Sequence, residues 1–205
     1  MNRGEIRSLV RIYIDELEEK RWKDTSLNLL INTVHNSVAS LFLSLDESLY
    51  SQDDEFAVST DSELYDLPVD FLRVKSIHTD DDDPVVRTPI SRKKKYEDAD
   101  SIRVYYFQGN QIGFLKIKSE QTLPFMYIRA PQPMLTDDAI PDVPVFLGHD
   151  LIAVEVAIHA LDLDEEMDTY LTRKKKELVE QIKSIHYRRN TDFAEQTEDD
   201  EDLEL

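Results

Sequence analysis

The side chains in this sequence that could carry out chemistry are five histidines and a large number of carboxylates. A zinc-binding pair on one helix needs two histidines four residues apart, and no such pair occurs among His35, His78, His149, His159 and His186. His149 and His159 fall in one predicted helix, but ten residues of separation put them about three turns apart and pointing in different directions. The histidines therefore predict no metal site.

The acidic run TDDDD at residues 79–83 could in principle hold a divalent cation. It lacks the glycine and the final glutamate of a calcium-binding loop, so we interpret it as a hydrated turn between strands. Pairs such as Asp137-Asp138 and Glu165-Glu166 carry no catalytic signal, because 43 of the 205 residues are acidic. Dinucleotide-binding, phosphate-binding and nucleophile-elbow motifs are absent, and the chain has only four glycines. We predict a protein that is not an enzyme and uses no cofactor; a metal-dependent hydrolase built on the acidic clusters is an alternative.

The charge balance restricts the partners of the protein. There are 24 Lys and Arg against 43 Asp and Glu, a net charge of −19, so most of the surface repels phosphate groups. The dense basic spots are the triple lysines at residues 93–95 and 174–176, which are either solvated faces or sites for an acidic partner such as another copy of the chain.

Cysteine is absent, which excludes disulfides and zinc–thiolate sites. No apolar run approaches the ~20 residues that span a bilayer, so we expect a soluble intracellular or particle-bound protein.

Two helices are predicted at the N-terminus. The first has an apolar stripe with helical spacing at Ile6, Leu9, Val10, Tyr13, Ile14 and Leu17, and Asn2 with Glu5 forms a plausible capping box in front of it. The second, capped by Asp24 or Thr25, has a longer stripe at Leu27, Leu30, Ile31, Val34, Val38, Leu41, Phe42 and Leu45. These two helices cannot cover both stripes alone, so other elements must pack on them.

Helical spacing disappears between residues 51 and 141, where short apolar runs alternate with Pro, Asp and Gly. Strands are predicted at residues 55–60, 71–78, 84–90, 102–107, 112–117 and 123–129, with a short helical turn at 93–98. The segment RVYYFQGNQIGFLKI predicts a hairpin turning at Gly109-Asn110, in which Tyr106 lies opposite Gly113.

This hairpin has no solvent face. One face collects Ile102, Val104, Tyr106, Leu115 and Ile117, and the other collects Tyr105, Phe107, Ile112 and Phe114. The second face packs either against another part of the same chain or against a neighbouring molecule.

Helix returns after Asp142-Val143-Pro144 and is apolar on nearly every side, and Asp164 then caps a fourth helix with the charged run RKKKE at residues 173–177. We expect an α+β fold in which a four-helix bundle of residues 1–50 and 142–190 carries an inserted antiparallel β-sandwich-like domain, residues 51–141. Residues 191–205 should form an extended acidic C-terminal tail, because eight carboxylates from Asp192 onward leave too little apolar surface for ordering. The tail also contains the large apolar residues Phe193, Leu203 and Leu205. It is either a solubilising segment or a segment that docks on a partner.

Four stretches resemble the head-to-tail adaptor proteins (connector or head-completion proteins) of tailed bacteriophages. They are WKDTSLNLLIN from Trp22, YDLPVDFLRV from Tyr65, YYFQGNQIGF from Tyr105 and YIRAPQPMLTDDAIPDVPVFLGHDLIAVEVAIHAL from Tyr127. The similarity rests on the order of the elements and covers most of the chain except the acidic tail.

The resemblance implies a virion protein, assembled in the host cytoplasm, without catalysis, cofactor or membrane contact. Such adaptors form a homo-oligomeric ring of about twelve copies below the portal protein. The ring passes genomic DNA without specific binding and offers a platform to a downstream tail or nozzle protein. By this resemblance the C-terminal segment docks on the portal through Arg188, Arg189, Phe193, Leu203 and Leu205.

In a ring, the second hairpin face would meet the next copy or the tail, through Arg103, Tyr105, Phe107, Ile112, Phe114 and Lys116. Arg103 opposite Lys116 is a like-charge pair that needs an acidic partner. The alternative to an intersubunit contact is that this face packs on the helices of the same chain. The alternative function is an acidic DNA mimic or another protein-binding inhibitor. It accounts for the net charge but needs carboxylates spaced along a surface, whereas many here are concentrated in a turn and a tail.

Overall fold

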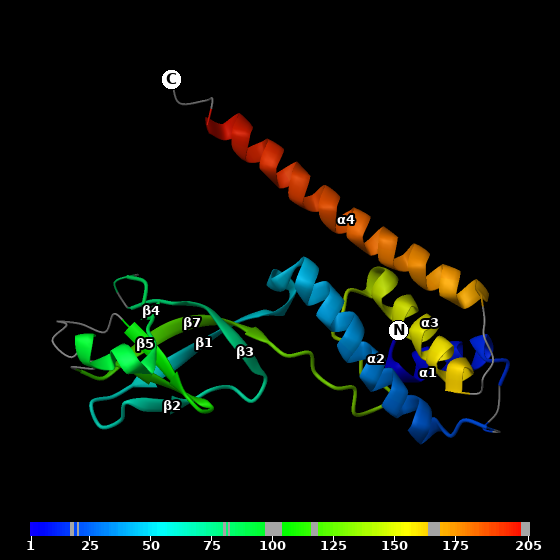
Figure 1. Cartoon of the computed structure of the whole chain (residues 1–205), viewed down its shortest axis with the longest axis horizontal. Helices are drawn as coiled ribbons and strands as arrows, with labels where there is room; N and C mark the ends of the chain where they lie inside the picture. Colours follow the sequence, from blue (N-terminus) through cyan, green and yellow to red (C-terminus); the bar gives the residue numbers. More distant parts are fainter. Residues whose placement is uncertain are drawn as a thin grey trace. The chain divides into compact units, whose positions relative to one another are not determined.

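The computed structural model describes residues 1–16, 19, 21–79, 81, 83–96, 104–115, 119–163 and 169–201. The chain forms two compact units, drawn in Figure 1. The helical unit combines Met1–Asp46 with Pro131–Leu205, and the β unit consists of Glu47–Ala130. The fold is therefore α+β, with the β unit inserted in the sequence between two groups of helices.

The first two helices follow the predicted apolar stripes. Helix α1, Arg3–Tyr13, begins with the predicted capping box of Asn2 and Glu5 and buries Ile6 and Val10. Helix α2, Asp24–Leu45, buries the stripe of Leu27, Ile31, Val34, Val38 and Phe42. The predicted cap is wrong, because Lys23 occupies the N-cap position without a side-chain hydrogen bond and Asp24 is already helical. The carboxylate of Asp24 binds Arg11 instead.

Helix α3, Val145–Leu163, packs against α1, α2 and α4. Its small and branched side chains are buried around most of the helix, as the apolar pattern predicts: Leu151, Ile152, Ala153, Val154, Val156, Ala157 and Ala160. A central position among three other helices explains why this segment has no polar face.

Helix α4, Thr169–Glu201, buries Leu171, Leu178 and Ile182. The prediction that the chain loses regular structure after Arg189 is wrong, since the helix continues to Glu201 (Figure 1). That prediction considered only the burial of apolar surface. A helix satisfies its backbone groups locally, and the Ala, Glu and Gln of this segment favour helix. Residues 202–205 and the predicted cap Asp164 lie outside the described residues.

The β unit starts with a short 3-10 helix, η1, Glu47–Tyr50, and contains two sheets. The first has the order β1-β7-β3, formed by Ser51–Val58, Gln121–Arg129 and Phe71–Ile77. The second has the order β2-β6-β5-β4, formed by Leu64–Asp66, Gln111–Phe114, Val104–Gln108 and Val86–Arg87. A second 3-10 helix, η2, spans Ile90–Tyr96, close to the predicted helical turn.

All strand pairs are antiparallel except β4 with β5. The strand predicted at residues 84–90 is reduced to Val86–Arg87, which pairs with β5 in parallel. The chain leaves β3 by a turn in which Val85 N–H donates to the Ile77 carbonyl at 2.9 Å, and then crosses to the other sheet. The prediction of a wholly antiparallel domain is therefore corrected at this one strand.

The hairpin of β5 and β6 has the predicted register, with Tyr105 opposite Phe114, Tyr106 opposite Gly113 and Phe107 opposite Ile112. Gly109 supplies the positive φ of 62° that the turn requires.

Candidate docking surfaces

The part of the chain that the structure describes contains no group of three or more His, Cys, Asp or Glu side chains arranged to hold a metal ion. Within the same described residues, no helix is long and apolar enough to span a membrane. The candidate functional features are therefore surfaces and the side chains that fix them.

The second face of the hairpin packs inside its own β unit. Tyr105 is buried, Ile112 and Phe114 are 0% exposed, and Phe107 is half-buried. The sheet that contains β1, β7 and β3 covers them, with the ring of Phe114 5.3 Å from Phe56 and the ring of Phe107 5.9 Å from Phe71. Tyr105, Ile112 and Phe114 have almost no surface to offer a neighbouring copy, so their predicted intersubunit role is corrected to a core role, with a sheet and not the helices as the cover. Phe107 keeps part of its surface, and its predicted contact stays a prediction.

The first face of the hairpin is also covered within the β unit. Val104, Tyr106 and Leu115 form a buried cluster against which Tyr96 of η2 packs. Lys93 anchors η2 beside it, with its ammonium 2.5 Å from the Glu63 carboxylate and 5.2 Å from the centre of the Tyr106 ring. The hydrogen bond to Glu63 raises the pKa of Lys93 above its usual value, so Lys93 stays charged at neutral pH. Arg103 and Lys116, the remaining predicted contact residues, lie outside the described residues.

The predicted portal-docking residues are only partly placed. Arg188 lies on α4 and is exposed. Arg189 and Phe193 lie on the same helix, with side chains outside the described set, and Leu203 and Leu205 lie outside the described residues. Among the described side chains of α4, burial ends at Ile182, and Ile185 and Tyr187 are exposed. Residues 183–188 of this helix thus present apolar and charged side chains to solvent.

Residues 131–144, which we name the anchored loop, are tied to α1 by two arginines. Arg3 and Arg7 each place a guanidinium nitrogen 2.8 Å from an oxygen of Asp137, and Arg3 also donates to the Met134 carbonyl at 2.7 Å. Hydrogen bonds from Arg7 and Arg3 hold the pKa of Asp137 well below its usual range. The Asp137 side chain is 50% exposed, whereas those of Arg3 and Arg7 are 11% and 16% exposed, so its role is the geometry of the contact with two well-covered arginines.

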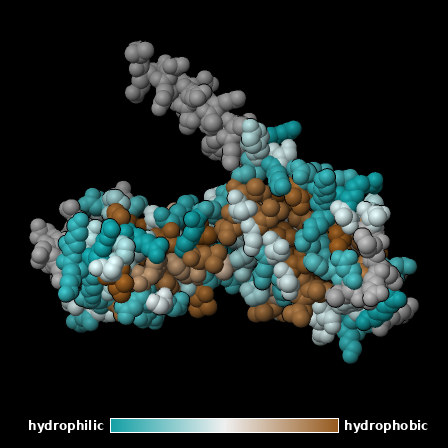
Figure 2. Space-filling view, in the orientation of Figure 1, coloured by the Kyte–Doolittle hydropathy of each residue, from teal (hydrophilic) through white to brown (hydrophobic). Residues whose placement is uncertain are grey.

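Helix α2 holds the other side of the anchored loop. The Asn32 side chain donates to the Met134 carbonyl at 3.1 Å and accepts from the Met134 N–H at 2.9 Å. His35 Nε2 accepts from the Asp142 N–H at 3.0 Å. This firmly held loop nevertheless exposes two large aliphatic side chains, Leu135 at 79% and Ile140 at 68%. Figure 2 shows hydrophobic side chains reaching the surface of the helical unit among hydrophilic ones.

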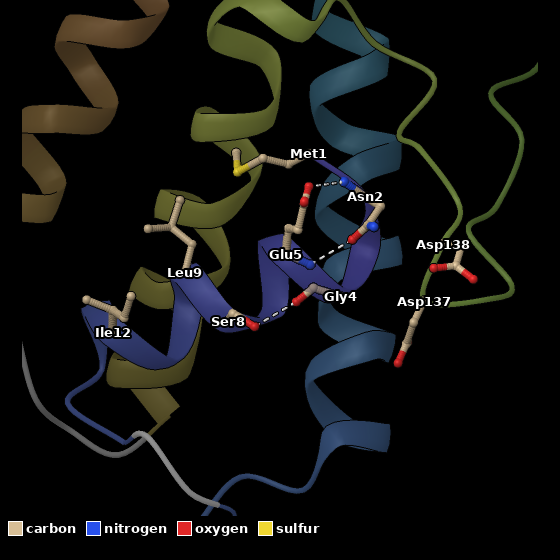
Figure 3. A pocket seen from close by; sticks show the side chains of 9 residues that line it. All are labelled: Met1, Asn2, Gly4, Glu5, Ser8, Leu9, Ile12, Asp137 and Asp138. Atoms are coloured by element: carbon tan, nitrogen blue, oxygen red, sulfur yellow. Dashed lines mark hydrogen bonds between the residues drawn. The ribbon is translucent and has the colours of Figure 1, made fainter.

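An open groove runs along α1 beside the anchored loop and is shown in Figure 3. Its apolar side chains include Leu9 and Ile12, and its carboxylates include Glu5 and Asp138. The Glu5 carboxylate is engaged by the Asn2 N–H at 2.9 Å, so it serves the capping box of the helix.

Two buried histidines support the helical core. His35 and His149 are both almost fully buried, and burial lowers the pKa of each below the usual 6.5. His149 Nδ1 lies 2.6 Å from the Met1 amine. Both rings are therefore neutral at pH 7, and they position neighbouring backbone instead of transferring protons.

The sequence pattern did not lead us to predict the ion pairs of the α1 arginines, although the spacing of these arginines was a signal for them. Arg3, Arg7 and Arg11 recur every four residues and so lie on one face of α1. Arg11 is buried and binds Asp24 at 2.6 Å, while Asp137, treated as one of many acidic residues, binds the other two. A cationic stripe beside an apolar stripe indicates carboxylate partners on neighbouring segments, which identifies these contacts as structural.

Comparison with known proteins gives one clear relationship. A search of curated proteins found no match. The family model of the SU10 adaptor protein matches residues 1–198, nearly the whole chain, including the long C-terminal helix. The chain therefore belongs to the SU10 adaptor protein family, a family of structural proteins that act as head-to-tail adaptors of bacteriophages.

Proposed function

We propose that this chain forms a homo-oligomeric ring of about twelve copies beneath the portal protein of a tailed bacteriophage. In this proposal the ring connects head to tail, extends the DNA channel, and presents a platform to a downstream tail or nozzle protein. The observation that carries the proposal is the family match over residues 1–198. The family match lends no support to the alternative of an acidic DNA mimic.

The helical unit suits an assembly role because its exposed contact residues are held firmly. In the proposal α1 to α4 form a four-helix bundle that acts as a rigid body. Arg3, Asn32 and His35 fix the anchored loop to it, so Leu135 and Ile140 lose little further conformational freedom when a partner covers them. Apolar side chains presented in this way are typical of the centre of an interface.

The net charge of −19 fits the proposed conduit. A wall that carries many carboxylates repels the phosphates of passing DNA, so the genome moves without adhering. The proposal therefore includes DNA as cargo of the channel and not as a specific ligand.

We assign portal docking to the part of the chain beyond Ile182, which is the end of α4 and the residues after it, with Arg188, Arg189, Phe193, Leu203 and Leu205 as the contact residues. Support comes from the end of described burial at Ile182 and from exposed Ile185 and Tyr187. The sequence of the helix also changes from basic at residues 183–189 to acidic at residues 192–201. One continuous helix therefore offers a partner two segments of opposite charge.

The test is binding to DNA-filled, tailless capsids that contain the portal. A chain ending at residue 189 keeps every described buried contact of α4, and we expect it to fold with unchanged unfolding midpoints. We expect it to lose co-sedimentation with the capsids. The matched control ends at residue 201, which keeps the helix and should retain most of the binding.

The two possible failures have different meanings. Equal binding by the chain that ends at residue 189 would overturn docking through residues 190–205. A full-length chain that fails to bind such capsids, while remaining folded, would overturn the adaptor function as a whole.

A further inference from the structure

The first step concerns the edge of the β unit formed by β1 and β2. The two strands belong to different sheets but lie together, because the rings of Phe56 and Tyr65 are 6.4 Å apart and the Ser59 N–H donates to the Tyr65 hydroxyl at 2.8 Å. β1 is the terminal strand of its sheet and pairs with β7 over eight residues without a bulge. Its other side has no strand partner within the described residues, so it offers outward backbone groups to a neighbour.

This edge is strongly acidic. Asp53, Asp54 and Glu55 are consecutive and exposed in β1, and Asp61 and Asp66 are exposed at the adjoining β2. Within the described residues, no lysine or arginine forms an ion pair with the three β1 carboxylates. We name these three residues the acidic edge.

The second step compares the two lysine runs of the chain. In α4, Lys174 donates to the Tyr13 hydroxyl at 2.6 Å, Lys175 lies 3.0 Å from Glu155, and Arg173 lies 3.6 Å from Glu177. That run is largely engaged within its own unit. Its charges therefore have a structural explanation.

The run in η2 differs. Among the described contacts of this run, Lys93 binds Glu63 and lies over the Tyr106 ring, which fixes the position of η2. Arg92, Lys94 and Lys95 are exposed and form no ion pair with a described carboxylate. Ile90 in the same element is 52% exposed. We name Arg92, Lys94 and Lys95 the basic knob; it is a preformed cationic surface on a chain of net charge −19.

We infer that the basic knob of one copy binds the acidic edge of the next copy. The occupant is a second copy of this chain, because the same polypeptide carries both halves of a charge-complementary pair. The two halves are different surfaces, so the contact is heterologous, the type that builds rings when the rotation between copies closes. The inference rests on the proposed ring and assigns residues to its subunit contact.

Zero-length crosslinking tests the contact directly. A carbodiimide joins carboxylates to lysines that touch, and an equal mixture of ¹⁴N- and ¹⁵N-labelled full-length chains separates contacts between copies from contacts within one. We expect mixed-isotope crosslinks that join Lys94 or Lys95 to Asp53, Asp54 or Glu55. Crosslinks confined to single-isotope pairs, or directed to other carboxylates such as those at 97–100, would overturn the inference.

Charge exchange gives an independent test by sedimentation at low salt. The variants Asp53→Lys/Glu55→Lys and Lys94→Glu/Lys95→Glu should each weaken self-association at least about tenfold. Mixing the two variants should restore it, because each then offers the charge that the other lacks. The control Lys176→Glu/Lys183→Glu makes the same charge change on exposed positions of α4 and should leave self-association unchanged.

Several outcomes would contradict the contact. If the carboxylates only keep strand edges apart, neutralising Asp53 and Glu55 would strengthen self-association instead. A wild-type chain that stays monomeric at all concentrations, or variants that are not rescued by mixing, would also overturn it. Loss of the contact with intact capsid binding would leave the adaptor function standing, whereas intact self-association without capsid binding would remove only that function.

Discussion

The ring of Tyr106 lies directly against the backbone of Gly113 on the opposite strand. A Cβ built at Gly113 would lie 2.6 Å from Tyr106 Cε1 and 2.7 Å from its hydroxyl oxygen. Tyr106 is buried, and its hydroxyl accepts a hydrogen bond from the ammonium of Lys93, a residue of η2, at 3.4 Å. The ring therefore cannot move away freely. The absence of a side chain at Gly113 is thus required by packing, since its φ is not in the positive range.

We predict that Gly113→Ala destabilises the β unit by about 1–3 kcal/mol through overpacking. Urea denaturation followed by tyrosine fluorescence measures the change. Gly4→Ala is the control, because a Cβ there meets only ordinary contacts at 3.5 Å. Adding Tyr106→Leu to Gly113→Ala should recover part of the loss, and equal stability of Gly113→Ala and wild type would contradict the packing argument.

Phe114→Asp should unfold the β unit. The side chain is 0% exposed and packs on Phe56 and Tyr65, so a carboxylate there would be buried without a partner. We expect a loss of more than about 4 kcal/mol, seen as a missing β-unit transition in calorimetry. Val86→Asp, at an exposed strand position, should change stability by less than about 0.5 kcal/mol. A folded Phe114→Asp protein that merely fails to join particles would restore the intersubunit role of this face.

Asn32→Ala should loosen the anchored loop. It removes both Asn32 hydrogen bonds to the Met134 backbone and leaves the Met134 N–H unpaired, at a cost of about 1–3 kcal/mol, while the Met134 carbonyl still accepts from Arg3. Limited proteolysis should then cut near the exposed Leu135 faster than in the wild type. Asn36→Ala, at an exposed position on the same helix, should leave the cutting rate unchanged. Cutting at equal rates in all three proteins would show that Asn32 does not hold the loop.

Arg11→Ala should strongly destabilise the helical unit. The guanidinium lies 2.6 Å from Asp24 and 3.6 Å from the buried Glu16, whose carboxylate also accepts the Arg21 and Trp22 N–H groups. Removing the cation takes away one charge partner of the buried Glu16, at a cost of about 3–5 kcal/mol. Asp24 keeps Arg7 at 3.3 Å. Chemical denaturation monitored at Trp22 reads the effect. Arg92→Ala, at an exposed position, serves as the control.

Stability of the helical unit should fall as the pH drops below 6.5. Burial lowers the folded-state pKa of His35 and His149 below 6.5, whereas the unfolded chain binds protons near that pH. Their contribution is therefore fully present above pH 6.5 and declines on acidification. Urea midpoints at several pH values measure the slope, and His35→Asn should flatten it. The control His159→Asn, at an exposed position, should leave the slope as it is in the wild type. An unchanged slope in His35→Asn would show that His35 does not cause the pH dependence.

The hairpin could be predicted from sequence because local signals agreed. Gly109-Asn110 marked the turn, and the alternation from Tyr105 to Phe114 determined which side chains share a face. The helices α1 and α2 were predictable for the same reason. By contrast, β2 has only three residues and β4 only two, too few for a periodic pattern, and the tertiary contacts of Tyr65 and Arg87 place them.

The cover over Tyr105 and Phe114 could not be predicted, because burial depends on partners far away in the chain. Phe56 and Phe125, which supply it, are separated from the hairpin in sequence, and periodicity says nothing of which face meets which. The same applies to Asp137, whose partners Arg3 and Arg7 are more than a hundred residues away. Periodicity indicates that a face is buried, and only the tertiary structure shows by what.

The β unit begins and ends at neighbouring points, since Ser51 near its start pairs with Ile128 near its end. A module whose two ends meet can be exchanged for another with a similar span without rebuilding its host helices. Excision of residues 47–130, with a short glycine-serine bridge, offers the experimental counterpart of that exchange.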